Sequence, residues 1–152
     1  MLEITQYSST LNSVLDNSKI TPEDILLFTR IDMDKELIKS DTYLFITKDS
    51  LFIVEGLNAI EGQTGFSIKR NRLKLTYCHK NTESYELSQY KDFSVEELIS
   101  TGRLIAKKGD ESVCLAIFTN ACKADVRLFV KYLNMYQKDG KIEKDEGDFK
   151  KD

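Results

Sequence analysis

Residues 102–118 read GRLIAKKGDESVCLAIF, which is two runs of strand-forming residues on either side of a short segment that contains Gly109. A glycine in a tight turn between two such runs is a strong signal for a β-hairpin. From Ala121 onward the apolar residues recur at the spacing of an α-helix instead. The helix stripe consists of Val126, Phe129, Val130, Leu133 and Tyr136. Thr119 or Asn120 is the expected N-cap, and Gly140 is expected to end the helix.

Working outward from this hairpin and helix, the rest of the chain reads mainly as short β-strands. Alternating or continuous apolar runs bounded by polar turns are typical of antiparallel strands. The segment 93–99 fits a strand or a helix, and the neighbouring pattern favours a strand. Expected loops and turns are 32–41, 48–50, 56–65 and 80–84. The remaining expected strands are 24–31, 42–47, 51–55, 66–68, 73–78 and a segment that begins at 85.

About seven antiparallel strands followed by one helix is the element order of a PH-like domain. We therefore predict a mainly β (α+β) fold, a PH-like two-sheet sandwich or partly open barrel. In this architecture the sheets pack nearly at right angles, and the C-terminal helix covers one open end. A lipocalin-like or other small barrel with a terminal helix is the alternative that the pattern leaves open.

The expected organisation is one domain with an extension at each end. Residues 1–22 are predicted to form an N-terminal extension with a short helix, because Leu11, Val14 and Leu15 have helical spacing. Residues 23–138 form the PH-like domain. Residues 139–152 are predicted to be a charged linker or tail, since ten of these fourteen residues are charged.

Composition limits the class of protein. The chain has 152 residues, of which 41% are hydrophobic, and this share is too high for a disordered protein. A formal net charge of −3 argues against a general nucleic-acid binder. The N-terminus does not have the pattern of a signal peptide, and there is no apolar run of about 18 residues. The three cysteines do not suggest a disulfide framework, so Cys114 and Cys122 are expected to pack as reduced residues in a cytoplasmic protein.

The sequence offers no recognisable catalytic, metal or cofactor site, so we expect a protein that is not an enzyme. Cys78 and His79 are adjacent on a predicted strand and should point to opposite faces. The acidic pairs Glu96–Glu97 and Asp32/Asp34 read as solvated groups at strand ends or in loops. The glycines at 62 and 65 lack the order of a phosphate-binding P-loop.

One group of cations is a candidate for binding an anionic partner. Arg70, Arg72 and Lys74 would share one face of an extended segment. Such a face could bind anionic lipid headgroups or an acidic partner, but it is more typical of an edge strand protected by charge. The loop 32–41, where many phosphoinositide-binding PH domains carry cations, holds four acids and two lysines here. This composition argues against inositol-phosphate binding.

Several short motifs resemble the N-terminal PH-like region of a group of bacterial ABC exporters, in which permease and ATPase are fused in one chain. The resemblance spans roughly residues 24–137, and the spacing from GRL to NA is its most specific part. The matching segments are DILL (24–27), LFIV (51–54), VEEL (95–98), GRLIA (102–106), TNA (119–121) and the helix with Phe129 and Leu133.

The resemblance implies a non-catalytic cytosolic accessory domain at the cytoplasmic face of the membrane. Its partners would be other domains of the parent transporter or a partner protein, and transport and ATP hydrolysis would belong to parts outside this chain. No ligand-binding or catalytic residue follows from the resemblance. The alternative is a free-standing PH-like module that binds anionic lipid or a peptide through Arg70, Arg72 and Lys74.

Overall fold

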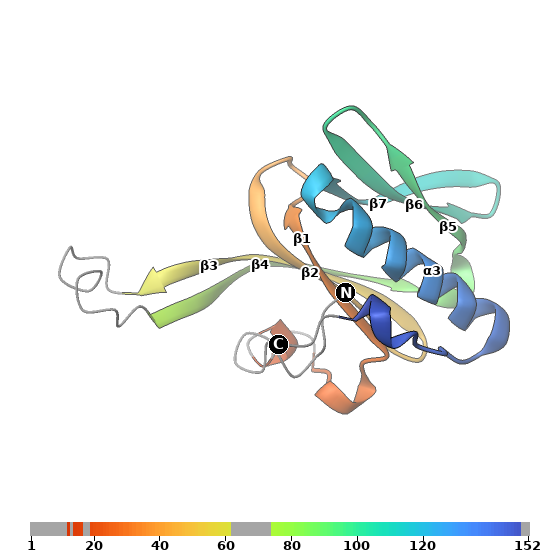
Figure 1. The fold of residues 1–152 in the computed structure, drawn as a ribbon. Coiled ribbons are helices and arrows are strands. Elements are labelled where there is room, and N and C mark those ends of the chain that lie inside the picture. Colours follow the sequence, from red (N-terminus) through yellow and green to blue (C-terminus); the bar gives the residue numbers. More distant parts are fainter. Residues whose placement is uncertain (1–11, 13, 17–18, 62–73, 150–152) are drawn as a thin grey trace.

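The computed structural model describes residues 12, 14–16, 19–61 and 74–149, with the backbone alone at 58–61 and 74–76. It is mainly β, with two antiparallel sheets of four and three strands and a long C-terminal helix (Figure 1). The coarse prediction of the fold class is therefore confirmed, and the sheets do not form a closed barrel. The strands are β1 (Leu27–Met33), β2 (Lys39–Ile46), β3 (Ser50–Glu61), β4 (Lys74–Glu86), β5 (Lys91–Glu97), β6 (Thr101–Lys108) and β7 (Glu111–Thr119).

The first sheet has the order β1-β2-β3-β4 and buries apolar side chains on both of its faces. Leu44 and Ile46 of β2 face the main core, while Tyr43 and Phe45 belong to a second cluster on the other face. This alternation follows from the two-residue period of a strand. Residues 14–16 are helical, and the buried side chains of Val14 and Leu15 belong to that second cluster.

The second sheet has the order β5-β6-β7, and Gly109 turns the β6–β7 hairpin with a φ of +63°. Residues 93–97 belong to β5, as the strand interpretation predicted. A bulge in β7 leaves Leu115 without an opposite residue, between the pairs Ile105–Cys114 and Leu104–Ala116. Because a bulge shifts the alternation of side chains by one, Leu115 and Ala116 are both buried while Cys114 is exposed. The expectation that Cys114 packs in the core was therefore wrong.

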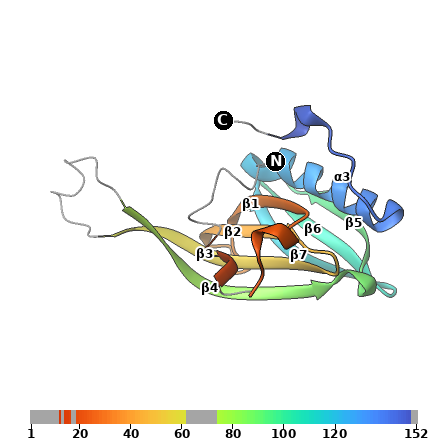
Figure 2. The ribbon, with the colours of Figure 1, turned by 90° about the horizontal axis from the view of Figure 1, so that it is seen from below.

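Helix α3 (Lys123–Asp139) contacts β1 and β5 and joins the two sheets in one core (Figures 1 and 2). Val126, Phe129, Val130 and Leu133 are buried, as the helical stripe predicted. The helix ends at Gly140, whose φ of +72° is the left-handed conformation that glycine adopts without strain. For α3, the expected N-cap at Thr119 or Asn120 was wrong. The short 3-10 helix η4 (Asn120–Cys122) precedes α3, and Cys122 is the N-cap residue of α3.

Strands β3 and β4 are longer than the sequence predicted and leave the body as a two-stranded ribbon. Pairing of β2 with β3 ends at Tyr43–Val54, but β3 continues to pair with β4 as far as Glu61–Lys74. Figure 1 shows this ribbon, residues 57–61 and 74–78, extending away from both sheets; we call it the β3–β4 arm. The predicted loop at 56–61 and the predicted turn at 80–84 were thus wrong, since both segments are strand. The expected strand 66–68 lies outside the described residues.

Part of the C-terminal segment packs against α3. The 3-10 helix η5 (Glu146–Asp148) precedes Phe149, whose ring lies 5.4 Å from that of Tyr132 and is buried in the main core. The Tyr132 hydroxyl donates to Asp148 at 2.6 Å. Phe149 is the one aromatic residue of the segment, and it accounts for this packing. Asp148 and Phe149 are therefore not part of the solvated tail that the charge of the segment predicted, whereas Glu146 and Gly147 are exposed.

Candidate functional site

Of the three cations predicted to face an anionic partner, the structure describes only the backbone of Lys74, at the far end of the β3–β4 arm. Lys74 is the first residue of β4, and its backbone pairs with Glu61. Arg70 and Arg72 lie outside the described residues, so a shared basic face stays a prediction.

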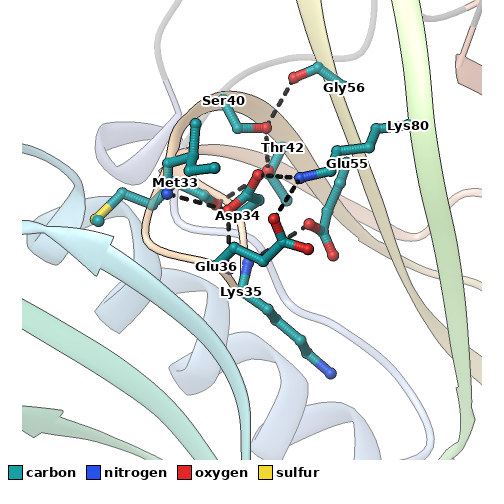
Figure 3. A network of polar contacts seen from close by, with 10 residues as sticks. Met33, Asp34, Lys35, Glu36, Ser40, Thr42, Glu55, Gly56 and Lys80 are labelled. Atoms are coloured by element: carbon teal, nitrogen blue, oxygen red, sulfur yellow. Dashed lines mark hydrogen bonds and ion pairs between the residues drawn. The ribbon is translucent and has the colours of Figure 1, made fainter.

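The most extensive polar network of the described chain surrounds Asp34, in the β1–β2 loop (Figure 3). The Asp34 side chain is almost fully buried, with 3% of the residue exposed. Its Oδ1 accepts hydrogen bonds from the backbone N–H groups of Glu36 (2.8 Å) and Ile38 (3.1 Å). Its Oδ2 accepts from the ammonium of Lys80 at 2.7 Å. The interpretation of Asp34 as a solvated loop residue was therefore wrong.

Lys80 reaches this loop because of an irregularity in β4. The pairs Glu55–Asn81 and Gly56–His79 leave Lys80 as an extra residue, that is, a β-bulge. From there its ammonium contacts both Asp34 and Glu36, the latter at 3.3 Å. Bulges redirect side chains in this way, and the sequence alone does not reveal their positions.

Further contacts fix the ends of the loop. The Ser40 hydroxyl donates to the Gly56 carbonyl at 2.7 Å, and the Thr42 hydroxyl donates to the Met33 carbonyl at 3.0 Å. The backbone N–H of Lys35 donates to the buried carboxylate of Glu55 at 3.4 Å. The loop is thus held on β1, β2, β3 and β4 together.

The electrostatics of the network favour its charged state. Burial alone would raise the pKa of Asp34, but the hydrogen bonds from Lys80, Ile38 and Glu36 outweigh burial and lower it. Glu83 behaves in the same way, since its contacts with Lys35 and Tyr85 lower its pKa despite burial. The Asp34 carboxylate accepts from three donors, two of them backbone N–H groups of the loop, so it positions the loop.

The loop that this network holds presents two apolar side chains to solvent. Leu37 is 59% exposed and Ile38 is 55% exposed. Leu37 also has a φ of +64°, in the left-handed region that costs a non-glycine residue of order 1 kcal/mol. Exposed aliphatic residues on a strained and well-anchored loop are a feature of binding sites.

The β5–β6 turn also exposes two adjacent aliphatic side chains to solvent. Ile99 is fully exposed and Leu98 is 38% exposed. The turn is tied to the start of α3, because the Asn120 side chain donates to the Ile99 carbonyl (3.2 Å) and the Lys123 ammonium donates to the Leu98 carbonyl (3.2 Å).

Two further hydrogen bonds bring these turns to the same end of the molecule. The backbone N–H of Asn120 donates to the Ser100 carbonyl at 3.2 Å. The backbone N–H of Thr119 donates to the Asp32 carboxylate at 2.9 Å, and the Thr119 hydroxyl also contacts it. Because Asp32 lies near the end of β1, two residues before the β1–β2 loop begins at Asp34, the chain segments 37–38 and 98–99 lie at one end of the sandwich. We call the side chains of Leu37, Ile38, Leu98 and Ile99 the apolar end.

Asp32 is half-buried at this junction, which again differs from the solvated residue expected. Burial raises its pKa, but the hydrogen bonds from the Thr119 side chain and backbone and from Cys122 bring the net shift below the usual value. The Cys122 thiol has a pKa raised to about 12, mainly by burial and then by the Asp32 charge. It is therefore a poorly nucleophilic cysteine that packs at the junction, as expected.

Charges around the apolar end are mixed and largely paired. Arg103 contacts Glu96 at 3.8 Å across β5 and β6, and Arg127 of α3 pairs with Glu97. Glu36 lies beside Leu37 in the loop. The surroundings thus contain acids and bases in similar number.

The other chemical candidates have structural positions. His79 is exposed and its Nε2 lies 2.7 Å from the Thr82 hydroxyl. Cys78 is exposed in the same strand. Within residues 12, 14–16, 19–61 and 74–149, no group of three or more His, Cys, Asp or Glu side chains could hold a metal ion. No helix in that part of the chain is long and apolar enough to cross a membrane.

Sequence reasoning missed the apolar end because both pairs fall in short polar segments. The only signal was two adjacent aliphatic residues inside each predicted loop or strand end, at 37–38 and 98–99. Comparisons with protein-family models, with curated proteins and with solved structures found no match.

Proposed function

We propose that this chain is a non-catalytic accessory domain that binds a protein partner through the apolar end. The observation that carries the proposal is the presentation of Leu37 and Ile38, two exposed aliphatic side chains on a loop anchored by the buried Asp34. A partner surface would bury these side chains and gain about 25 cal/mol per Å² of apolar area removed from water.

The charges around the apolar end favour protein over an anionic membrane as the partner. Glu36, Glu96 and Glu97 would approach a negatively charged lipid surface together with the aliphatic residues. Alternating acids and bases are instead the rim expected around the apolar core of a protein interface.

We further propose that the domain is PH-like and belongs to a bacterial ABC exporter, with its partner in the rest of that transporter. Two antiparallel sheets of four and three strands with a C-terminal helix support this fold assignment. Reading the coding sequence beyond Asp152 tests the exporter assignment. Apolar runs of about 20 residues followed by a P-loop would support it, and a stop codon would overturn it.

Site-specific photocrosslinking in cells of the source organism tests the docking proposal. A benzoylphenylalanine at position 38 or 99 should crosslink to one and the same protein, identified by mass spectrometry. Position 111, in the exposed β6–β7 hairpin at the other end of β6, is the control and should not form that adduct. Equal crosslinking from position 111, or adducts with lipid alone, would overturn the proposal.

A second candidate function is binding of anionic lipid through Arg70, Arg72 and Lys74. The position of Lys74 at the end of an arm that extends from the body favours it, since a flat surface could approach there (Figure 1). Sedimentation with phosphatidylserine vesicles that is lost at high salt and in an Arg70→Ala/Arg72→Ala variant would support this function. No binding at low salt would exclude it.

A further inference from the structure

A shallow basic cleft, wide open to solvent, lies between the second sheet and the C-terminal half of α3. Its volume is about 640 Å³. The lining residues are Lys91, Asp92, Phe93, Ser94, Lys107, Asn134, Gln137 and Lys138. Three lysines and one acid line this cleft in a chain whose net charge is −3. The cleft lies on β5, β6 and α3, so it shares no lining residue with the apolar end.

The strand register places two of these lysines directly opposite each other. Lys91 of β5 pairs with Lys107 of β6, and like charges in directly opposite positions destabilise an antiparallel pair. The register then shifts by one residue at Asp92, whose φ is +53°. Two features that lower the stability of the fold therefore lie at one edge of the cleft. They are the like-charge pair and a non-glycine residue in the left-handed conformation.

Hydrogen bonds from α3 hold the opposite wall in place. The Asn134 side chain donates to the Phe93 carbonyl at 2.9 Å. The Gln137 side chain donates to the carbonyls of Tyr90 (2.8 Å) and Leu87 (3.1 Å). These bonds join the helix to β5 and to the segment that precedes it, and Lys138, next to Gln137, lines the same cleft as the strand lysines.

None of the three lysines has an ion-pair partner among the described residues, whereas Lys35, Lys80 and Lys131 each contact a carboxylate. Lys138 lies in the last turn of α3, where it also compensates the helix dipole. That role does not account for Lys91 and Lys107, which are on strands.

We propose that this cleft binds a phosphate group through Lys91, Lys107 and Lys138. A phosphate carries nearly two negative charges and several acceptor oxygens, so it can neutralise cations on three separate elements. Three lysines and Asp92 give the cleft a net charge of +2, so a single carboxylate would leave half of it uncompensated. The phosphate belongs to a small phosphorylated molecule or to a lipid headgroup, and both share the chemistry that the cleft recognises.

Calorimetric titration at low salt with inorganic phosphate and with pyrophosphate tests the proposal. Pyrophosphate should bind, and Lys107→Gln or Lys138→Gln should raise its Kd at least about tenfold, since each removes a charge-assisted hydrogen bond. Lys39→Gln is the matched control, because Lys39 is an exposed lysine at the other end of the molecule without an ion-pair partner among the described residues. Its Kd should equal that of the unmodified chain.

Two further measurements locate the site and identify the source of the phosphate. Backbone NMR shifts on titration should concentrate at residues 91–94, 107 and 134–138. Flotation with phosphatidylcholine vesicles, with and without phosphatidic acid, separates a lipid headgroup from a soluble ligand. Binding of vesicles that contain phosphatidic acid, lost in Lys107→Gln, indicates the lipid source, and binding of pyrophosphate alone indicates the soluble source.

The unliganded protein gives an independent readout of the same site. Because Lys107→Gln removes the like-charge pair, its Tm should equal or exceed that of the unmodified chain, so that lost binding cannot be ascribed to misfolding. If neither anion nor either vesicle binds, or if Lys39→Gln weakens binding as much as Lys107→Gln, the proposal is wrong.

Discussion

Replacement of Asp34 by alanine should destabilise the protein and release the β1–β2 loop. The substitution leaves the N–H groups of Glu36 and Ile38 without the carboxylate oxygen that accepts from both. Hydrogen bonds to a charged group contribute about 1.5–3 kcal/mol each, and water will partly replace them in a surface loop. We therefore expect the free energy of unfolding to fall by about 3 kcal/mol, with no contribution from the ion pair to the half-exposed Lys80.

Asp34→Asn is the matched control. Its amide oxygen can still accept from both backbone N–H groups, so only the charge and the hydrogen bond from Lys80 are lost. The expected loss is about 1 kcal/mol. Urea unfolding at pH 7 measures both values, and hydrogen exchange at Glu36 and Ile38 shows whether the loop has opened. Exchange should accelerate strongly in Asp34→Ala and weakly in Asp34→Asn.

The pH dependence gives the sign of the electrostatic effect. Because folding lowers the pKa of Asp34, the stabilisation is fully present above its unfolded pKa of about 3.9 and is lost as pH falls through the folded value. The difference in stability between the unmodified chain and Asp34→Asn should therefore shrink below about pH 4. Unchanged urea midpoints and unchanged exchange in Asp34→Ala would refute the role of Asp34 as the organiser of the loop.

Three other substitutions or measurements follow from the same structure. Gly56→Ala should lower the free energy of unfolding by about 1–3 kcal/mol, since the new Cβ would lie 2.7 Å from the Cys78 carbonyl oxygen and against the Tyr77 ring. Urea unfolding measures this loss, and a loss below the error of the measurement would contradict the close approach. Leu37→Asn should leave the free energy of unfolding unchanged or slightly higher, because asparagine tolerates the left-handed conformation, while it abolishes the crosslink from position 38. Cys122 should react with a thiol reagent at pH 8 much more slowly than the exposed Cys78, because burial and the Asp32 charge raise its pKa to about 12. Mass spectrometry of the labelled peptides distinguishes the two cysteines.

The sequence predicted the elements whose signal is local. The hairpin at 102–118 and the helix stripe at 126–133 depend on side-chain period and on single glycines, and the structure has both. It also predicted the number of sheet strands in outline, because the apolar runs are separated by polar turns. These features need no knowledge of which strands become neighbours.

The sequence could not predict features that depend on pairing. The bulges at Lys80 and Leu115 arise from register with a partner strand, so the exposure of Cys114 and the approach of Lys80 to Asp34 had no local signal. The residues 80–84 are polar and turn-like, yet β3 pairs with them and makes them strand. The burial of Asp34 likewise depends on donors from a segment 46 positions away.

Two of the three described non-glycine residues with a positive φ lie in the two proposed sites, and the third, Lys19, lies outside both. Positive φ angles occur at Leu37 in the apolar end and at Asp92 in the basic cleft, and a like-charge strand pair lies beside the latter. A fold selected for stability alone would favour glycine or asparagine at these turns and opposite charges in that pair. Strained backbone angles and like-charge pairs are kept where function requires an arrangement that lowers stability. We therefore expect that Leu37→Asn and Lys107→Gln each keep or raise the stability of the protein, and that each removes one binding activity with no effect on the other.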